Sequence, residues 1–219
     1  MSIEENNINY DYITDYIRDI IPERTGLLKE LELYAEENHV PIVQPEVARL
    51  LSVLANMIRP EHILEIGTAI GYSAILLSQG LQPGGKVVTI ERYHKMVELS
   101  RENIKRANLE HVIEVVEGEA EKILPNLTGE FDFIFMDAAK GHYMEFFHHC
   151  MRMLKPKGVL VSDNVLYKGM IASDKLVIRR KKTIVKRMRE YLTMLFNHPQ
   201  LDTAIIPIGD GVAISYKKP

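Results

Sequence analysis

The chain has 219 residues, 46% of them hydrophobic, and a formal net charge of −3 at pH 7. This length suits one domain with a continuous core. No apolar run approaches the roughly 20 residues that span a bilayer. The first residues show neither the basic nor the apolar region of a secretion signal. The single cysteine, Cys150, cannot form an internal disulfide, so we expect a cytoplasmic protein. The net charge argues against a protein that coats nucleic acid over its whole surface.

The spacing of apolar residues predicts three helices in the first part of the chain. The first begins near Tyr10, the second covers about residues 27–34, and the third runs from Val47 to just before Pro60. Strand-like runs then alternate with helical stretches, at residues 62–66, 86–91, 112–117, 131–137 and 158–163. This alternation predicts an α/β fold with a doubly wound, mainly parallel sheet.

The end of the chain departs from the alternation of strands and helices. Two strand-like runs, 203–208 and 212–217, are joined only by Gly209, Asp210 and Gly211. A connection that short makes a hairpin and not a crossover, so we expect the sheet to have seven strands and to finish with an antiparallel one. No repeat or flexible linker marks a second domain, and we expect one domain over residues 1–219.

Oxygen-bearing side chains follow two of the predicted strands. Asp137 ends the run FDFIFM, and Asp163 and Asn164 end GVLVS. In a parallel sheet both runs reach the same carboxyl-terminal edge, where open α/β folds bind their ligands. Two carboxylates and an amide suit Mg²⁺, with Mn²⁺ as an alternative, and Lys140 would lie beside the ion. The other interpretation is that Asp ends strands often and that Asp163 caps a turn.

A glycine-bearing loop follows the first strand. Gly67 and Gly71 lack side chains where a ligand would press against the backbone, and the helix after them offers free N–H groups. Glu91 ends the second strand, where it can accept hydrogen bonds from ribose hydroxyls. The spacing is neither G-x-G-x-x-G nor that of a phosphate loop, so a nucleoside without phosphates fits better. Any strand-to-helix turn also accommodates glycine, which is the structural alternative.

A basic segment occurs late in the chain. It contains Lys175, Arg179, Arg180, Lys181, Lys182, Lys186, Arg187 and Arg189, with no acidic residue before Glu190. Such a run is usually a solvated helix face, but it can also follow the phosphates of a nucleic acid.

These motifs together resemble a known family, the class I S-adenosylmethionine-dependent methyltransferases. Within it, LEIGTAIGYSA, Glu91, FIFMDAAKGHY, LVSDNVL and GDGVAIS resemble the cation-dependent catechol and caffeoyl-CoA O-methyltransferase group. In that group the chain is most similar to bacterial tRNA 5-hydroxyuridine methyltransferases, which make 5-methoxyuridine at the wobble position. YAEENHVPIV, DNVLYKGM, the basic segment and NHPQLDTAIIPIGDG carry this closer match.

The resemblance implies roles for particular residues. Those that would contact the amino-acid end of S-adenosylmethionine are Glu65, Gly67, Thr68, Gly71 and Ser73. Glu91 would hold the ribose, and Glu119 with Ala120 the adenine, although the family commonly has Asp at position 119. Asp137, which is also part of the cofactor site, would bind the metal with Asp163 and Asn164. Val43 matches a segment that closes over the cofactor, and residues 1–58 would form helices covering the cofactor and substrate side.

A metal at these residues would orient two vicinal substrate oxygens, as in catechol or in the 5-hydroxyl and 4-keto groups of 5-hydroxyuracil. Lys140 is the candidate general base, since a partly desolvated Lys beside a cation can have a lowered pKa. Its alternative role is to pair with a ligand carboxylate. We expect Tyr143 to pack near the adenine.

Three functions follow from this interpretation. The first is a tRNA wobble-uridine O-methyltransferase whose Arg179, Arg180, Lys181 and Lys182 bind the anticodon loop. The second is a small-molecule catechol-type O-methyltransferase, for which such a run of cations brings no gain. The third, a binding protein without catalysis, has no need of the metal residues. The resemblance also implies a homodimer.

Overall fold

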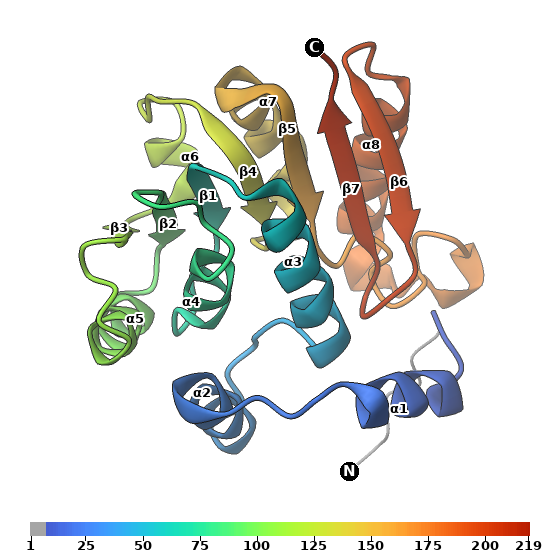
Figure 1. Ribbon diagram of the computed structural model, residues 1–219. Coiled ribbons are helices and arrows are strands. Elements are labelled where there is room, and N and C mark those ends of the chain that lie inside the picture. The colour runs from blue at the N-terminus through green and yellow to red at the C-terminus, as the bar shows by residue number, and fades with distance from the viewer. Residues whose placement is uncertain (1–7) are drawn as a thin grey trace.

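The computed structural model describes residues 8–219, and residues 1–7, part of the predicted N-terminal helical region, lie outside this range. Its centre is a seven-stranded sheet with the order β3-β2-β1-β4-β5-β7-β6 (Figure 1). The strands are β1 (His62–Ile66), β2 (Lys86–Glu91), β3 (Ile113–Glu117), β4 (Phe131–Met136), β5 (Leu154–Ser162), β6 (Leu201–Ile206) and β7 (Val212–Lys217).

Helices connect these strands. They are α1 (Asp11–Ile20), α2 (Gly26–Glu37), α3 (Pro45–Ile58), α4 (Tyr72–Ser78), α5 (His94–Arg106), α6 (Ala120–Ile123), α7 (Tyr143–Met153) and α8 (Lys182–Asn197), with short 3₁₀ turns at Lys140–His142, Asp174–Leu176 and Arg179–Lys181. The predicted doubly wound α/β fold, with three helices before the first strand, is confirmed. Among the described residues, no helix is both long and apolar enough to cross a membrane.

The end of the sheet has the predicted antiparallel strand. β7 lies between β5 and β6 and is antiparallel to both, whereas the other pairs are parallel. β5 begins earlier than the predicted 158–163, because Leu154 already pairs with Phe131. A register shift between Phe131 and Phe133 separates this pair from the regular ladder. Lys157 has a φ of 67°. Strand propensity does not reveal such an irregular start.

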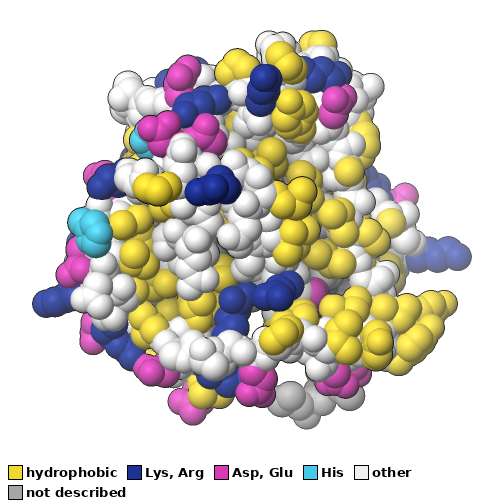
Figure 2. All heavy atoms as spheres, viewed as in Figure 1, with side chains coloured by type: hydrophobic (Ala, Val, Ile, Leu, Met, Phe, Trp, Pro, Cys, Tyr) yellow, Lys and Arg dark blue, Asp and Glu magenta, His cyan; other side chains and the backbone are white. Residues whose placement is uncertain are grey.

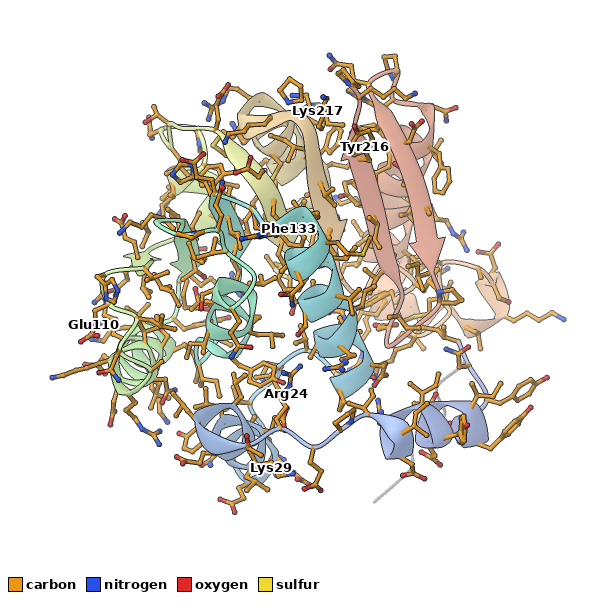
Figure 3. The ribbon with its side chains drawn as sticks, viewed as in Figure 1. Arg24, Lys29, Glu110, Phe133, Tyr216 and Lys217 are labelled. Atoms are coloured by element: carbon orange, nitrogen blue, oxygen red, sulfur yellow. The ribbon has the colours of Figure 1, made fainter. Side chains whose placement is uncertain are left out.

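Two hydrophobic clusters sandwich the sheet, because parallel strands are buried on both faces. Phe133 and Phe135 of β4 point into the cluster under α2, α3, α4 and α5, and Figure 3 shows Phe133 behind α3. Their neighbours Ile134 and Met136 point into the other cluster, under α7 and α8. This alternation within one strand fixes its register, since a slip of one residue would exchange the two faces. The ends of the strands are therefore held firmly in place.

Candidate functional site

The two acidic strand ends lie next to each other. Met136 of β4 pairs with Ser162 of β5, so Asp137 and Asp163 both lie one residue beyond this pair. The Asp137 amide donates to Ile66 O at 3.0 Å, and the Asp163 amide donates to Met136 O at 3.0 Å. The backbone thus holds both carboxylates at one edge of the sheet.

The electrostatics of this edge favour a bound cation. Asp163 is 2% exposed, and burial together with the charge of Asp137 raises its pKa to about 8. Burial also raises the pKa of Asp137, which the charge of Lys140 partly counters. The Lys140 Nζ donates to Asn164 Oδ1 at 2.7 Å. Asp163 is buried, Asp137 is half-buried, and the two carboxylates share the ammonium of Lys140. This leaves a deficit of positive charge, and the adjacent amide oxygen adds a third hard ligand.

A second acidic group lies at the opposite end of the sheet, around Glu61, His62 and Asp132. Burial alone would raise the pKa of Asp132, but the amides of His62 and Glu61 and the ammonium of Lys155 lower it. These donors lie 2.8, 3.0 and 3.0 Å from the Asp132 carboxylate. Asp132 therefore accepts from an ammonium and two amides, whereas Asp163 Oδ1 accepts from the Asn164 amide at 2.7 Å.

A cavity of about 820 Å³ begins at the Asp137 edge and extends past the ends of β1, β2 and β3. Most of the predicted site residues line it: Val43, Gly67, Thr68, Ser73, Glu91, Glu119, Ala120, Asp137, Lys140, Asp163 and Asn164. Glu65 and Gly71 do not line it and lie behind its wall. The structure thus brings the predicted nucleoside and metal residues to one cavity, which is large enough for a nucleoside-sized ligand.

The two loop glycines meet a steric requirement within the protein itself. Gly67 has a φ of +106°, and a Cβ there would lie 2.1 Å from the carbonyl oxygen of Asp137. Gly71 has a φ of +85°, and its Cβ would lie 3.3 Å from Ser100 Cβ. Neighbouring protein atoms thus already require glycine at position 67, which also lines the cavity. Gly67 permits the β1 loop to pass against the strand end that carries Asp137.

Glu65 is the most unusual buried group. Its side chain is fully buried, one oxygen accepts from Thr89 Oγ1 at 2.5 Å, and Oε1 has no hydrogen-bond partner among the described residues. Burial raises its pKa to about 8, although the nearby hydroxyls of Ser73 and Thr89 partly lower it. An unpaired buried oxygen costs stability unless a ligand satisfies it. A cationic ligand group would do so.

Glu91 is tied to the backbone. One carboxylate oxygen accepts from the Ala69 amide and the other from the amides of Arg92 and Tyr93, each at 2.9 Å. A carboxylate has about four acceptor positions, so capacity remains for a ligand hydroxyl. Glu119 is more open, with 45% of its side chain exposed and Arg92 at 3.7 Å.

Two features of the cavity were missed in the sequence. The Tyr72 hydroxyl, from a residue that lines the cavity, donates to Glu32 at 2.6 Å, and Glu32 also pairs with Arg24 at 3.3 Å. Figure 3 shows Arg24 between α2 and α4. The Tyr143 hydroxyl donates to the carbonyls of Met136 and Asp163, at 3.2 and 3.0 Å. Tyr143 therefore supports the carboxylate edge, and its expected position beside the adenine is wrong.

Some cations of the basic segment are exposed, and others contact the protein. Arg179, Arg180 and Lys182 are exposed, whereas Lys181 lies 5.6 Å from the centre of the Tyr167 ring. The remaining contacts are structural: Arg187 donates to Gly141 O, and Arg189 donates to the carbonyls of residues 170 and 171 and pairs with Asp174. Since Tyr167 and Gly141 flank Asn164 and Lys140 in sequence, the segment borders the metal edge of the cavity.

Comparison with known proteins defines the class. The profile of the O-methyltransferase family matches residues 20–218, so the chain belongs to this family. The chain is 31% identical to a catechol O-methyltransferase of Niastella koreensis, with 97% of this chain and all of the relative aligned. It is 36% identical to a catechol O-methyltransferase of Mycobacterium tuberculosis over 79% of each chain. An O-methyltransferase of Bacillus cereus in complex with SAH matches with a TM-score of 0.84 and 29% identity, over 94% of this chain and 97% of that one.

The fold, the cavity and these relatives agree. The protein is an S-adenosylmethionine-dependent O-methyltransferase with the Rossmann-like fold of class I methyltransferases.

The packing of Gly67 leads to a prediction about stability. Gly67→Ala should unfold at a distinctly lower temperature than the parent, because the new methyl group would collide with the carbonyl of Asp137. Gly129→Ala is the matched control, since its φ is also positive, +115°, but nothing lies within 4 Å. Both variants carry a backbone strain of about 1–3 kcal/mol, and only Gly67→Ala carries the collision as well. Equal melting temperatures in calorimetry would contradict this account.

Proposed function

We propose that the protein is a divalent-metal-dependent enzyme that methylates one oxygen of a vicinal oxygen pair. The observation that carries this proposal is the pair of carboxylates at the ends of β4 and β5, one buried and the other half-buried, which share the ammonium of Lys140. Asp137, Asp163 and Asn164 would hold the ion. When bound, such an ion supplies a Lewis acid that lowers the pKa of a hydroxyl and fixes its direction.

The cofactor would occupy the rest of the cavity. We assign its amino-acid end to Glu65, whose unpaired Oε1 suits an ammonium, together with the backbone of Gly67 and Gly71 and the hydroxyls of Thr68 and Ser73. Glu91 has acceptor capacity for the ribose hydroxyls. Glu119 and Ala120 lie where the adenine would fit, and buried Val43 belongs to the segment that closes the cavity. The cofactor supplies the methyl group as a sulfonium.

Lys140 is the proposed general base. Its Nζ lies 2.7 Å from Asn164 Oδ1, so it is held at the metal residues and within reach of a substrate hydroxyl there. As a neutral amine, Nζ would accept the proton of the substrate hydroxyl while the hydroxyl oxygen bonds to the methyl carbon. The bond between that carbon and the cofactor sulfur would break at the same time, so the cofactor would leave as a neutral thioether. Asp137 and Asp163 would keep that oxygen in line with the methyl, which contributes through orientation.

The relatives favour a catechol-type small molecule as the substrate. The two catechol O-methyltransferases named above act on a compound with vicinal hydroxyls, and they align with most or all of their length. A catechol would meet the metal residues at the open end of the cavity. A catechol substrate requires no contact with the basic segment.

A second candidate substrate is 5-hydroxyuridine in the wobble position of tRNA. The observation in its favour is that Arg179, Arg180 and Lys182 are exposed and that Lys181 packs on Tyr167, three residues beyond Asn164. Cations at this position would follow the phosphates on either side of a nucleotide whose base enters the cavity.

We also propose that the enzyme works in the cytoplasm as a homodimer. The exposed side of α1 carries apolar side chains that a second copy would cover, among them Tyr12, Tyr16 and Ile20, which are 60–69% exposed. Figure 2 shows this apolar area at the lower right, over α1.

Methylation assays with purified protein distinguish the two substrates. We expect transfer to catechol in the presence of Mg²⁺ but not of EDTA, whichever substrate is natural. The variant R179Q/R180Q/K181Q/K182Q should methylate catechol as the parent does, because these residues contribute no group to the cavity. If RNA is the substrate, the same variant should bind hydroxyuridine-containing tRNA more weakly, with a shallower slope of log affinity against log salt.

The matched control neutralises four exposed cations elsewhere, Arg49, Lys105, Lys122 and Lys157. It should leave tRNA methylation unchanged. Wild-type methylation of tRNA by the variant of the basic segment would remove the RNA candidate and leave the catechol-type one. Catechol methylation at the full rate in EDTA would refute the metal-dependent mechanism.

Glu65 predicts a pH dependence of cofactor binding. Its pKa is raised to about 8 in the free protein, so it is mostly protonated at neutral pH, and an ammonium partner would favour the ionised form. Binding should therefore release a proton, and affinity should rise by up to about tenfold per pH unit below the free pKa. Calorimetry in two buffers with different ionisation enthalpies measures the release. Glu65→Gln should bind weakly with no such dependence; the same proton release in that variant would assign it to another group.

A further inference from the structure

The loop after the metal residues has a strained backbone. Asn164, Tyr167 and Lys168 have φ values of 54°, 46° and 56°, in the left-handed region that non-glycine residues rarely adopt. Three such residues within five positions persist only where the surroundings impose them. Asn164 is one of these residues, and its side chain faces Lys140. Something must therefore hold this loop in shape.

The turn between β6 and β7 provides that support. The Val165 amide donates to Gly211 O at 2.9 Å, and the Leu166 amide donates to Asp210 O at 3.0 Å. The Lys168 amide donates to Oδ1 of the Asp210 side chain. Gly211 is also in direct contact, since a Cβ there would lie 2.3 Å from Leu166 Cγ. The hairpin turn thus meets the loop along its whole length.

We propose that Asp210 is a positioning residue, whose carboxylate and backbone hold the loop 164–168 in the strained conformation that presents Asn164 to the metal edge. We call this set of contacts between Asp210 and the loop 164–168 the clamp. The role of Asn164 rests on the proposed function, whereas the clamp does not. Asp210 does not line the cavity and so acts through the loop.

The test must distinguish the charge of Asp210 from its hydrogen bond to the Lys168 amide. Asp210 is one of the groups that raise the pKa of Asp163, after burial and Asp137. Asp210→Asn keeps an oxygen acceptor for the Lys168 amide and removes the charge. Asp210→Ala removes both. Asp202→Ala is the matched control, because Asp202 lies in the same hairpin but is exposed and pairs with Lys218, at 3.0 Å.

Two measurements on the full chain test the clamp. Amide hydrogen exchange of a peptide covering residues 164–170, without metal, should be about fivefold faster in Asp210→Ala, the effect of one lost hydrogen bond, and unchanged in Asp210→Asn and Asp202→Ala. In parallel, the Mg²⁺ concentration for half-maximal activity should rise severalfold more in Asp210→Ala than in Asp210→Asn, which loses only the charge, with SAH affinity unchanged in both.

Unchanged exchange in Asp210→Ala, or equally fast exchange in Asp210→Asn, would overturn the clamp. If Asp210→Ala does not fold, Asp210→Glu displaces the carboxylate by one methylene and should show the faster exchange, and an unchanged rate there would overturn it as well. A parent enzyme that needs no metal would refute the proposed function while the exchange result still stands.

Discussion

The structure depends on one electrostatic constraint, the placing of two carboxylates at neighbouring ends of β4 and β5, one buried and the other half-buried, beside Lys140. Like charges in such a place repel each other, and burial raises the pKa of both Asp137 and Asp163. The fold tolerates this cost because the register of the two strands is fixed by the cores on both faces of the sheet. A divalent cation at this edge would turn the repulsion into the attraction that the proposed chemistry needs.

Much of the surrounding architecture serves to hold that edge. Gly67 lets the loop after β1 pass against the carbonyl of Asp137. The Tyr143 hydroxyl donates to the carbonyl of Asp163. The turn at Asp210 supports the loop that begins with Asn164. Behind the wall of the cavity beside it, Glu65 has one oxygen without a partner among the described residues. Two positions therefore lack positive charge. The edge at Asp137 and Asp163 would suit a metal ion, and Glu65 would suit the ammonium of an amino acid.

The fold and the pairing of the two carboxylates at one sheet edge were predictable because they follow from local patterns. Alternating apolar runs predict the strands, and the acidic residue after each run then falls at the sheet edge by topology alone. Contacts between distant segments were not predictable. The neighbour of Gly67 comes from β4, the unpaired oxygen of Glu65 depends on Thr89 of β2, and the partner of the 164–168 loop is a turn more than 40 residues later. Tyr143 was misplaced because helical spacing does not say which strand ends its hydroxyl reaches.

The most direct measurement is an anomalous-scattering map from crystals grown with Mn²⁺ and SAH. The account predicts one Mn²⁺ held by Asp137, Asp163 and Asn164, and its loss in crystals of Asp163→Asn grown under the same conditions. No manganese at these residues at saturating concentration, or manganese at Glu61, His62 and Asp132 in its place, would contradict it.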